Sequence, residues 1–135
     1  MSQAPIDYAI VKAVAGSYEE TVEAARKALA DQGFGILSEI DVAATLKNKL
    51  GADTPRTLIL GACNPPMALR ATTAVPDIAV FLPCNVVIRE SAQGVEVSAM
   101  DPKAMGRVID NPEVTAVAGE VDQKIRAALD ALPGR

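Results

Sequence analysis

Two cysteines are the residues of this sequence best suited to carry chemistry. Cys63 and Cys84 are the only thiols among the 135 residues, each is followed by an asparagine, and each lies close to a proline. We expect Cys63 to end one strand and Cys84 to begin a later one, so both thiols lie at the same edge of the sheet if these strands are antiparallel neighbours. Cys63 also directly precedes an expected helix, whose N-terminal N–H groups and dipole would lower a thiol pKa or hold an anion.

This pair of thiols is compatible with four interpretations. Cysteine behaves as a small hydrophobe, so both residues would simply pack in the interior. A redox or sulfur-relay protein would use Cys63 as the thiolate and Cys84 as its resolving partner. A soft metal or a cluster would need further sulfur, from Met67 or from the four thiolates of a dimer, because two ligands per chain are too few. The fourth interpretation is a pocket for a small anionic molecule.

The neighbours of the cysteines complete the candidate site. The spacing of the thiols is neither Cys-x-x-Cys nor a standard metal pattern, and a disulfide is not expected in a reducing cytosol. Arg89 and Arg70 would face a carboxylate or phosphate ligand, or else be solvated or bridge a dimer. Asn64 is first of all a helix cap. The expected ligand-binding residues are Cys63, Asn64, Met67, Cys84, Asn85 and Arg89; no catalytic residue, metal site or cofactor is assigned.

Composition excludes several other functions. The sequence has no histidine, which rules out Ser-His-Asp and Cys-His catalysis and His-ligated zinc or haem within one chain. Its 13 basic and 17 acidic residues give a net charge of −4, with only two tyrosines and two phenylalanines, so nucleic acid is not an expected partner. The N-terminus lacks a signal-peptide pattern and no apolar stretch approaches the roughly 18 residues of a membrane helix. We therefore expect a cytoplasmic protein that does not bind membranes.

Hydrophobic periodicity predicts the elements that position these residues. Strands are expected over 6–14, 34–40, 57–62, 84–90 and 95–99, the last two joined as a hairpin by residues 91–94. A first long helix begins with a capping box at Ser17 and ends at Gly33, and a second begins at Asn111. Short helices are expected after Asp41, after Asn64 and after Asp101. Residues 77–82 are too few to distinguish a strand from a buried helical turn.

These elements predict a single α+β domain over residues 1–135. The expected architecture is a two-layer sandwich, in which a mainly antiparallel five-stranded sheet carries two long helices on one face; the order is β-α-β-β-β-β-α with short helical insertions. The other face of the sheet would carry Ile59 and Val87 beside Thr57, Arg89 and Ser98. An exposed face of this kind favours self-association, so we expect a homodimer.

Three segments of the sequence resemble a known prokaryotic family. They are Leu60-Gly61-Ala62-Cys63-Asn64-Pro65-Pro66-Met67-Ala68, Leu82-Pro83-Cys84-Asn85-Val86-Val87-Ile88 and Ser98-Ala99-Met100-Asp101-Pro102. Together they are similar to the family called domain of unknown function 302, over about residues 8–132. The resemblance implies a small α+β fold that is often a homodimer, and it implies no assigned reaction. The function expected from the sequence is therefore a non-catalytic small-molecule binding or interaction module around Cys63, Asn64 and Cys84, with the thiol-redox and soft-metal roles as alternatives.

Overall fold

The elements of the fold follow the sequence pattern closely. The computed structural model describes residues 8–135, so Ile6, expected in the first strand, lies outside the described residues. The strands are β1 (Ala9–Val14), β2 (Gly35–Asp41), β3 (Thr57–Cys63), β4 (Cys84–Ser91) and β5 (Gly94–Met100). The helices are α1 (Tyr18–Asp31), α2 (Val42–Leu50), α3 (Pro65–Ala74), α4 (Lys103–Val108) and α5 (Pro112–Asp130), with a 3-10 helix, η1 (Pro76–Phe81). The ambiguous residues 77–82 therefore lie mostly in η1.

The five strands form one antiparallel sheet. Their order is β1-β5-β4-β3-β2, and each neighbouring pair is antiparallel. The strands β4 and β5 form the predicted hairpin, in which Ser91 pairs with Gly94 across a two-residue turn. Gly94 has a φ of 128°, a conformation that L side chains rarely adopt, so a glycine suits this position. The predicted fold class is confirmed.

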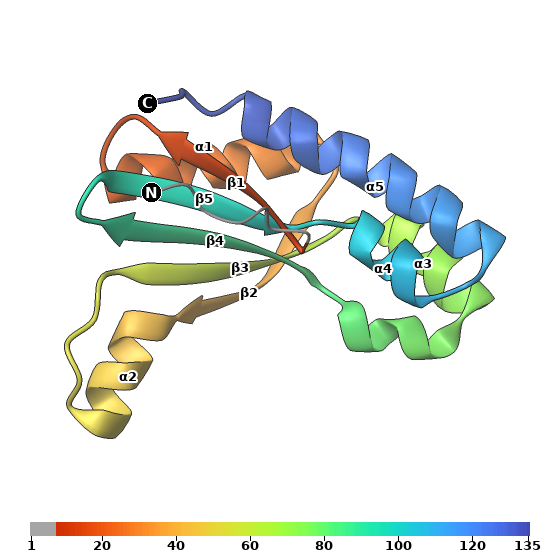
Figure 1. Ribbon diagram of the computed structural model, residues 1–135, viewed down its shortest axis with the longest axis horizontal. Helices are drawn as coiled ribbons and strands as arrows, with labels where there is room; N and C mark the ends of the chain where they lie inside the picture. The colour runs from red at the N-terminus through yellow and green to blue at the C-terminus, as the bar shows by residue number, and fades with distance from the viewer. Residues whose placement is uncertain (1–7) are drawn as a thin grey trace.

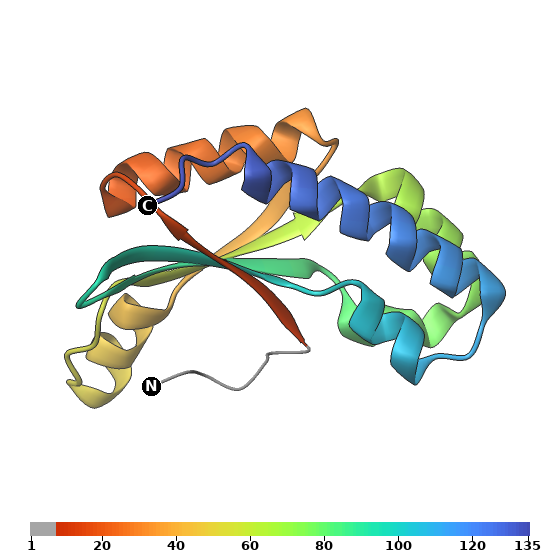
Figure 2. The ribbon, with the colours of Figure 1, turned by 45° about the horizontal axis from the view of Figure 1, so that its top comes forward.

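The long helices α1 and α5 cover one face of the sheet (Figure 2). Side chains of alternate strand residues point toward these helices, and each helix presents a stripe of aliphatic side chains to the sheet. The core therefore lies between the two layers. Fully buried members include Leu60, Val86, Ile88, Val97 and Ile125. Burial of a side chain of this size contributes about 1.5–3 kcal/mol. Across residues 8–135, no helix combines the length and the apolar character needed to cross a lipid bilayer.

Side chains cap both long helices at their N-termini. Ser17 Oγ accepts a hydrogen bond from Glu20 N (3.1 Å), and Glu20 Oε1 accepts one from Ser17 N (3.0 Å), which is the predicted capping box. At the start of α5, Asn111 Oδ1 accepts hydrogen bonds from the backbone N–H groups of Glu113 and Val114. The caps fix where each helix begins, and hence which of its faces meets the sheet.

A lysine from the edge strand closes the C-terminal end of α5. Lys12 lies on β1, and its Nζ donates hydrogen bonds to the carbonyl oxygens of Leu129 (2.9 Å) and Leu132 (2.6 Å). The helix dipole places partial negative charge at this end of α5, where Leu129 O also accepts a hydrogen bond from the backbone N–H of Leu132 (3.0 Å). Lys12 therefore joins the first strand to the last helix by a charge-assisted contact.

The helices α1 and α5 leave the second face of the sheet uncovered. The cross-strand register aligns Val11, Ser98, Val87, Ile59 and Ile40 in one row across all five strands of this open face. Val11 is 40% exposed and Ile40 is 48% exposed, whereas Ile59 and Val87 are half-buried. The helix α2 projects away from α1 and α5 at this side and buries none of its residues (Figure 2).

Three short helical segments extend the molecule beyond one end of the sheet. The helices α3 and α4 both pack against α5, and η1 packs against α3. They lie beside the N-terminal half of α5, on the side opposite to the β4–β5 turn (Figure 1). At this end, helices rather than strands enclose the interior.

Candidate functional site

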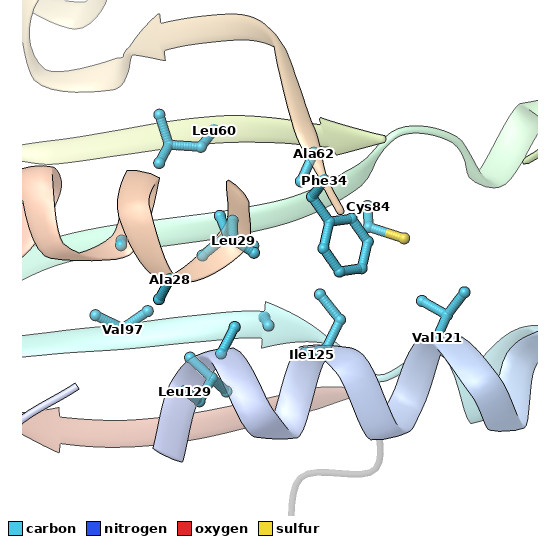
Figure 3. Packing of buried hydrophobic residues seen from close by; sticks show 14 of the residues in the cluster. Ala28, Leu29, Phe34, Leu60, Ala62, Cys84, Val97, Val121, Ile125 and Leu129 are labelled. Carbon is cyan, nitrogen blue, oxygen red and sulfur yellow. The ribbon is translucent and has the colours of Figure 1, made fainter. Parts of the chain in front are cut away.

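The sheet register brings the two cysteines to the same end of the sheet. Cys63 is the last residue of β3 and Cys84 is the first residue of β4, and these strands are antiparallel neighbours in which Ala62 pairs with Cys84. Cys84 is buried and Cys63 is partly exposed, and both are free thiols. Figure 3 shows Cys84 beside Phe34, with its sulfur directed away from the ring. The juxtaposition depends on the strands being adjacent, which the sequence did not settle.

Cys63 and Cys84 are both among the residues that line one small cavity between the end of the sheet and the short helices, although alternation along β3 places the Cys63 side chain on the face opposite to that of Ala62 and Cys84. Its volume is about 20 Å³, which is room for about one water-sized guest. Of the ligand-binding residues expected from the sequence, Cys63, Asn64, Met67 and Cys84 line this cavity. The rest of the lining is almost entirely apolar: Phe34, Ala62, Ala68, Ala71, Ile78, Leu82, Met105, Val117 and Val121. No charged side chain from residues 8–135 lines the cavity.

Burial controls the acidity of Cys84. Loss of water around the thiol, with a smaller contribution from neighbouring Cys63, raises the pKa of Cys84 from 9.0 to about 11. The thiol is therefore protonated at neutral pH and is a poor nucleophile. The raised pKa reduces the chemical case for Cys84 as a resolving thiol.

The start of α3 offers fewer hydrogen-bond donors than expected. Asn64 occupies the N-cap position, but its side chain makes no cap hydrogen bond; its Nδ2 donates to the carbonyl of Gln32 instead (3.3 Å). The prediction that the Asn64 side chain caps this helix is therefore wrong. Pro65 and Pro66 occupy the first helical positions and have no N–H group, so two of the amides that would hold an anion are missing.

Two of the expected site residues lie outside this cavity. Asn85 follows buried Cys84 in β4, so its side chain lies on the open face, where it is exposed. Arg89 lies four residues farther along the same face, where its Nη2 is 3.4 Å from Glu96 Oε1 on β5. Arg70 of α3 is held by α5, since its Nε donates to Glu113 (2.7 Å) and its Nη1 to Glu120.

The sequence interpretation missed one residue with relevant chemistry. Met105, on α4, is 3% exposed and lines the cavity together with Met67. Its helix has only six residues, too few for a periodic pattern to show which side faces the interior. A count of sulfur atoms would have singled out Met105 as one of only four methionines, but only the tertiary structure brings α4 to the cysteines.

Comparisons with known proteins agree on one family. The family model described as "Domain of unknown function DUF302" matches residues 10–132. A solved structure, described as an uncharacterized conserved DUF302 protein from Bacillus stearothermophilus, is similar with a TM-score of 0.87 and 25% sequence identity. The similarity covers 94% of this chain and 99% of that chain. A search of curated proteins gave no match.

Proposed function

Because the chain belongs to the DUF302 family, whose description assigns no activity, we propose that it is a non-catalytic module that binds a small guest. The cavity carries this proposal, since Cys63, Asn64, Met67 and Cys84 all line it although they are up to 21 positions apart in the sequence. Its apolar walls favour an uncharged guest, because a buried charge needs a partner. The missing amides of Pro65 and Pro66 make an anionic ligand less favourable.

The groups around the cavity are poorly suited to catalysis. General acid–base chemistry needs a group that titrates near the working pH, and the sequence has no histidine. Among residues 8–135, the only residues with titratable side chains in the lining of the cavity are Cys63 and Cys84. The thiol-redox alternative needs a reactive resolving thiol, and the raised pKa of Cys84 opposes it.

A cavity-filling substitution tests the proposed binding role. Ala71 lies on α3, is 3% exposed and lines the cavity, so Ala71→Val would occupy the space that a guest needs. The experiment is a ligand-observed NMR screen of uncharged and anionic fragments against the wild-type chain and Ala71→Val. The cavity has room for only about one water-sized guest, so we expect uncharged fragments to bind the wild-type protein by displacing the partly exposed side chain of Met67, and to lose binding in Ala71→Val.

The matched control is Ala28→Val. Ala28 is also buried, but it lines a separate void beneath α1, so the same substitution there adds the same atoms away from the proposed site. Fragments that bind both variants equally would contradict the location. A screen in which only anionic fragments bind, or in which none binds, would contradict the proposed role.

The open face supports a second proposal, that the protein is a homodimer. The row Val11, Val87, Ile59 and Ile40 gives this face an apolar stripe that α1 and α5 leave uncovered. A two-fold pairing of this stripe with itself would remove it from water. Analytical ultracentrifugation at micromolar concentration should show a dimer that Val87→Glu converts to a monomer. A wild-type monomer at that concentration would contradict the proposal.

We also propose that the chain acts as one domain in the cytoplasm. One sheet and one buried cluster involve the strands and both long helices, and the two cysteines are free thiols, as in reducing compartments. A single cooperative unfolding transition, and recovery in the cytoplasmic fraction of the source cells, are the expected observations. Two separate transitions, or recovery outside the cytoplasm, would contradict it.

A further inference from the structure

Met67 forms the most flexible part of the cavity wall. The partly exposed residues of the lining are Cys63, Met67, Ala68 and Leu82, and the other lining residues are buried. Met67 has the longest side chain of these four, with three rotatable bonds. It packs against the buried core cluster, one turn before Ala71 on the same side of α3. Met67 therefore lies between the cavity and solvent near the start of α3.

Arg70 contacts the sulfur of Met67. Arg70 Nη1 lies 3.8 Å from Met67 Sδ, which is a weak hydrogen bond to a thioether. The two residues are three positions apart on α3, so their side chains are neighbours on the helix surface. Because this bond is weak, its effect on Met67 depends on how firmly Arg70 itself is held.

Two carboxylates of α5 hold Arg70. Its Nε donates a hydrogen bond to Glu113 Oε1 (2.7 Å), and its Nη1 donates one to Glu120 Oε2. Glu113, Val117 and Glu120 follow one another at helical spacing, which places them along one stripe of α5. Val117 is buried and lines the cavity, so the two ion pairs flank a wall of the cavity. The guanidinium thus joins α3 to α5 directly beside the site.

The ion pairs favour the inward position of Met67. An isolated exposed ion pair contributes little, but charges that form a network contribute more, and salt weakens both by screening. Arg70 fixed by Glu113 and Glu120 presents its Nη1 to the Met67 sulfur at a constant place. When Met67 turns outward, its sulfur loses this partner while the arginine stays with the carboxylates.

We propose that Arg70 is a positioning residue that holds Met67 in the cavity wall and so limits the entry of the small uncharged guest. The proposal rests on the proposed function, because it assigns control of entry to the same cavity. A guest binds when Met67 has turned out of the wall, so the apparent affinity is reduced by the fraction of molecules in that state. Loss of the Arg70 contacts raises this fraction. Replacing Arg70 should therefore strengthen guest binding, whereas loss of a residue that contacts the guest would weaken it.

The test measures binding of ethyl methyl sulfide, which is a methionine side chain released from its Cα, by ligand-observed NMR. We expect Arg70→Gln to bind this probe about two- to fivefold more tightly than the wild-type chain, as expected for the loss of exposed ion pairs. Glu120→Gln should give a smaller gain, because Glu113 still holds the arginine. High salt should raise the affinity of the wild-type chain toward that of Arg70→Gln and change the variant less, because it screens the same ion pairs.

The matched control is Arg26→Gln. The Arg26 side chain on α1 is 30% exposed and pairs with Glu23 and Glu39, whereas that of Arg70 is 36% exposed and pairs with Glu113 and Glu120. Arg26 does not line the cavity, so Arg26→Gln should bind the probe as the wild-type chain does. An equal gain in both variants would be an effect of net charge and would overturn the proposal.

The position of Met67 is also measurable without a guest. In protein labelled with 13C at the methionine methyl groups, a soluble paramagnetic agent broadens the resonances of exposed methyls. The Met67 resonance should broaden more in Arg70→Gln than in the wild-type chain. The Met105 resonance is the internal reference and should be the same in both, because Met105 is 3% exposed.

The outcomes separate this proposal from the binding role. If the probe binds in a manner sensitive to Ala71→Val, but Arg70→Gln leaves its affinity and the Met67 resonance unchanged, the positioning role fails and the binding module stands. Weaker probe binding in Arg70→Gln would also overturn the positioning role. If the Met67 resonance broadens as predicted but no probe binds to any variant, the binding module fails, and control of entry fails with it.

Discussion

The acidity of Cys84 distinguishes a binding cavity from a thiol active site. The structure raises the pKa of this thiol from 9.0 to about 11, chiefly because burial removes water from the thiolate. At pH 10, a thiol with a pKa near 11 is about one-tenth ionised, whereas a thiol with a pKa near 9 is about nine-tenths ionised. The ionised fraction of Cys84 at pH 10 therefore distinguishes a thiol buried in a binding cavity from a thiol with an ordinary pKa.

The assay is an NMR titration of the Cys63→Ser variant with 13C-labelled cysteine. Cys84 is then the only thiol, and its Cβ chemical shift reports ionisation at equilibrium, whatever the rate of any reaction. The smaller contribution of Cys63 is lost in this variant, but the larger one, burial, remains. We expect little titration below pH 10 and a midpoint well above 9.0. The same variant unfolded in urea serves as the control and should titrate near its ordinary value.

A midpoint at or below 9.0 in the folded protein would refute this reasoning. It would mean that water or a positively charged group contacts the Cys84 thiolate. The apolar lining of the cavity provides neither. The thiol-redox interpretation would then regain support, because a thiolate available near neutral pH is what such chemistry requires.

Three further predictions concern stability. The pKa of Cys84 is raised in the folded state, so the unfolded state loses this proton first as pH rises. The free energy of unfolding should therefore fall by about 1.4 kcal/mol per pH unit from pH 9 toward 11. In urea titrations, Cys84→Ala should remove this slope. Gly61→Ala should destabilise the protein by about 1–3 kcal/mol, because the added Cβ would lie 2.2 Å from Ser38 Oγ. Adding Ser38→Gly to the same chain should restore part of the lost stability. No restoration would contradict this contact. Lys12→Met should lower the free energy of unfolding by about 0.5–2 kcal/mol in urea denaturation at low salt, because it uncaps the C-terminal end of α5. The control Lys49→Met, at an exposed position of α2, should lower it little. Equal effects of the two substitutions would contradict the cap.

The secondary structure was predictable because local signals agree with the tertiary fold. The capping box at Ser17 and the Asn111 cap identify the starts of both long helices, and alternation along β4 and β5 identifies the hairpin. These features depend on residues within a few positions of each other. The class of fold then follows from the order of the elements and from the need to bury one face of each.

The site was less predictable because it depends on contacts between distant segments. Alternation along β4 is a local rule, and it already implies that Asn85 and Arg89 lie on the face opposite to Cys84. Grouping all three in one site overlooked that rule. By contrast, no local pattern shows that α4 brings Met105 to the cavity, or that the Asn64 side chain binds Gln32 rather than its own helix.

The location of the binding site is the central claim, and methyl NMR tests it most directly. Resonances of Ile, Leu and Val methyl groups would be followed while the wild-type protein is titrated with uncharged fragments. The account predicts shifts at Ile78, Leu82, Val117 and Val121, which line the cavity. Shifts confined to Val11, Ile59 and Val87 on the open face would contradict it.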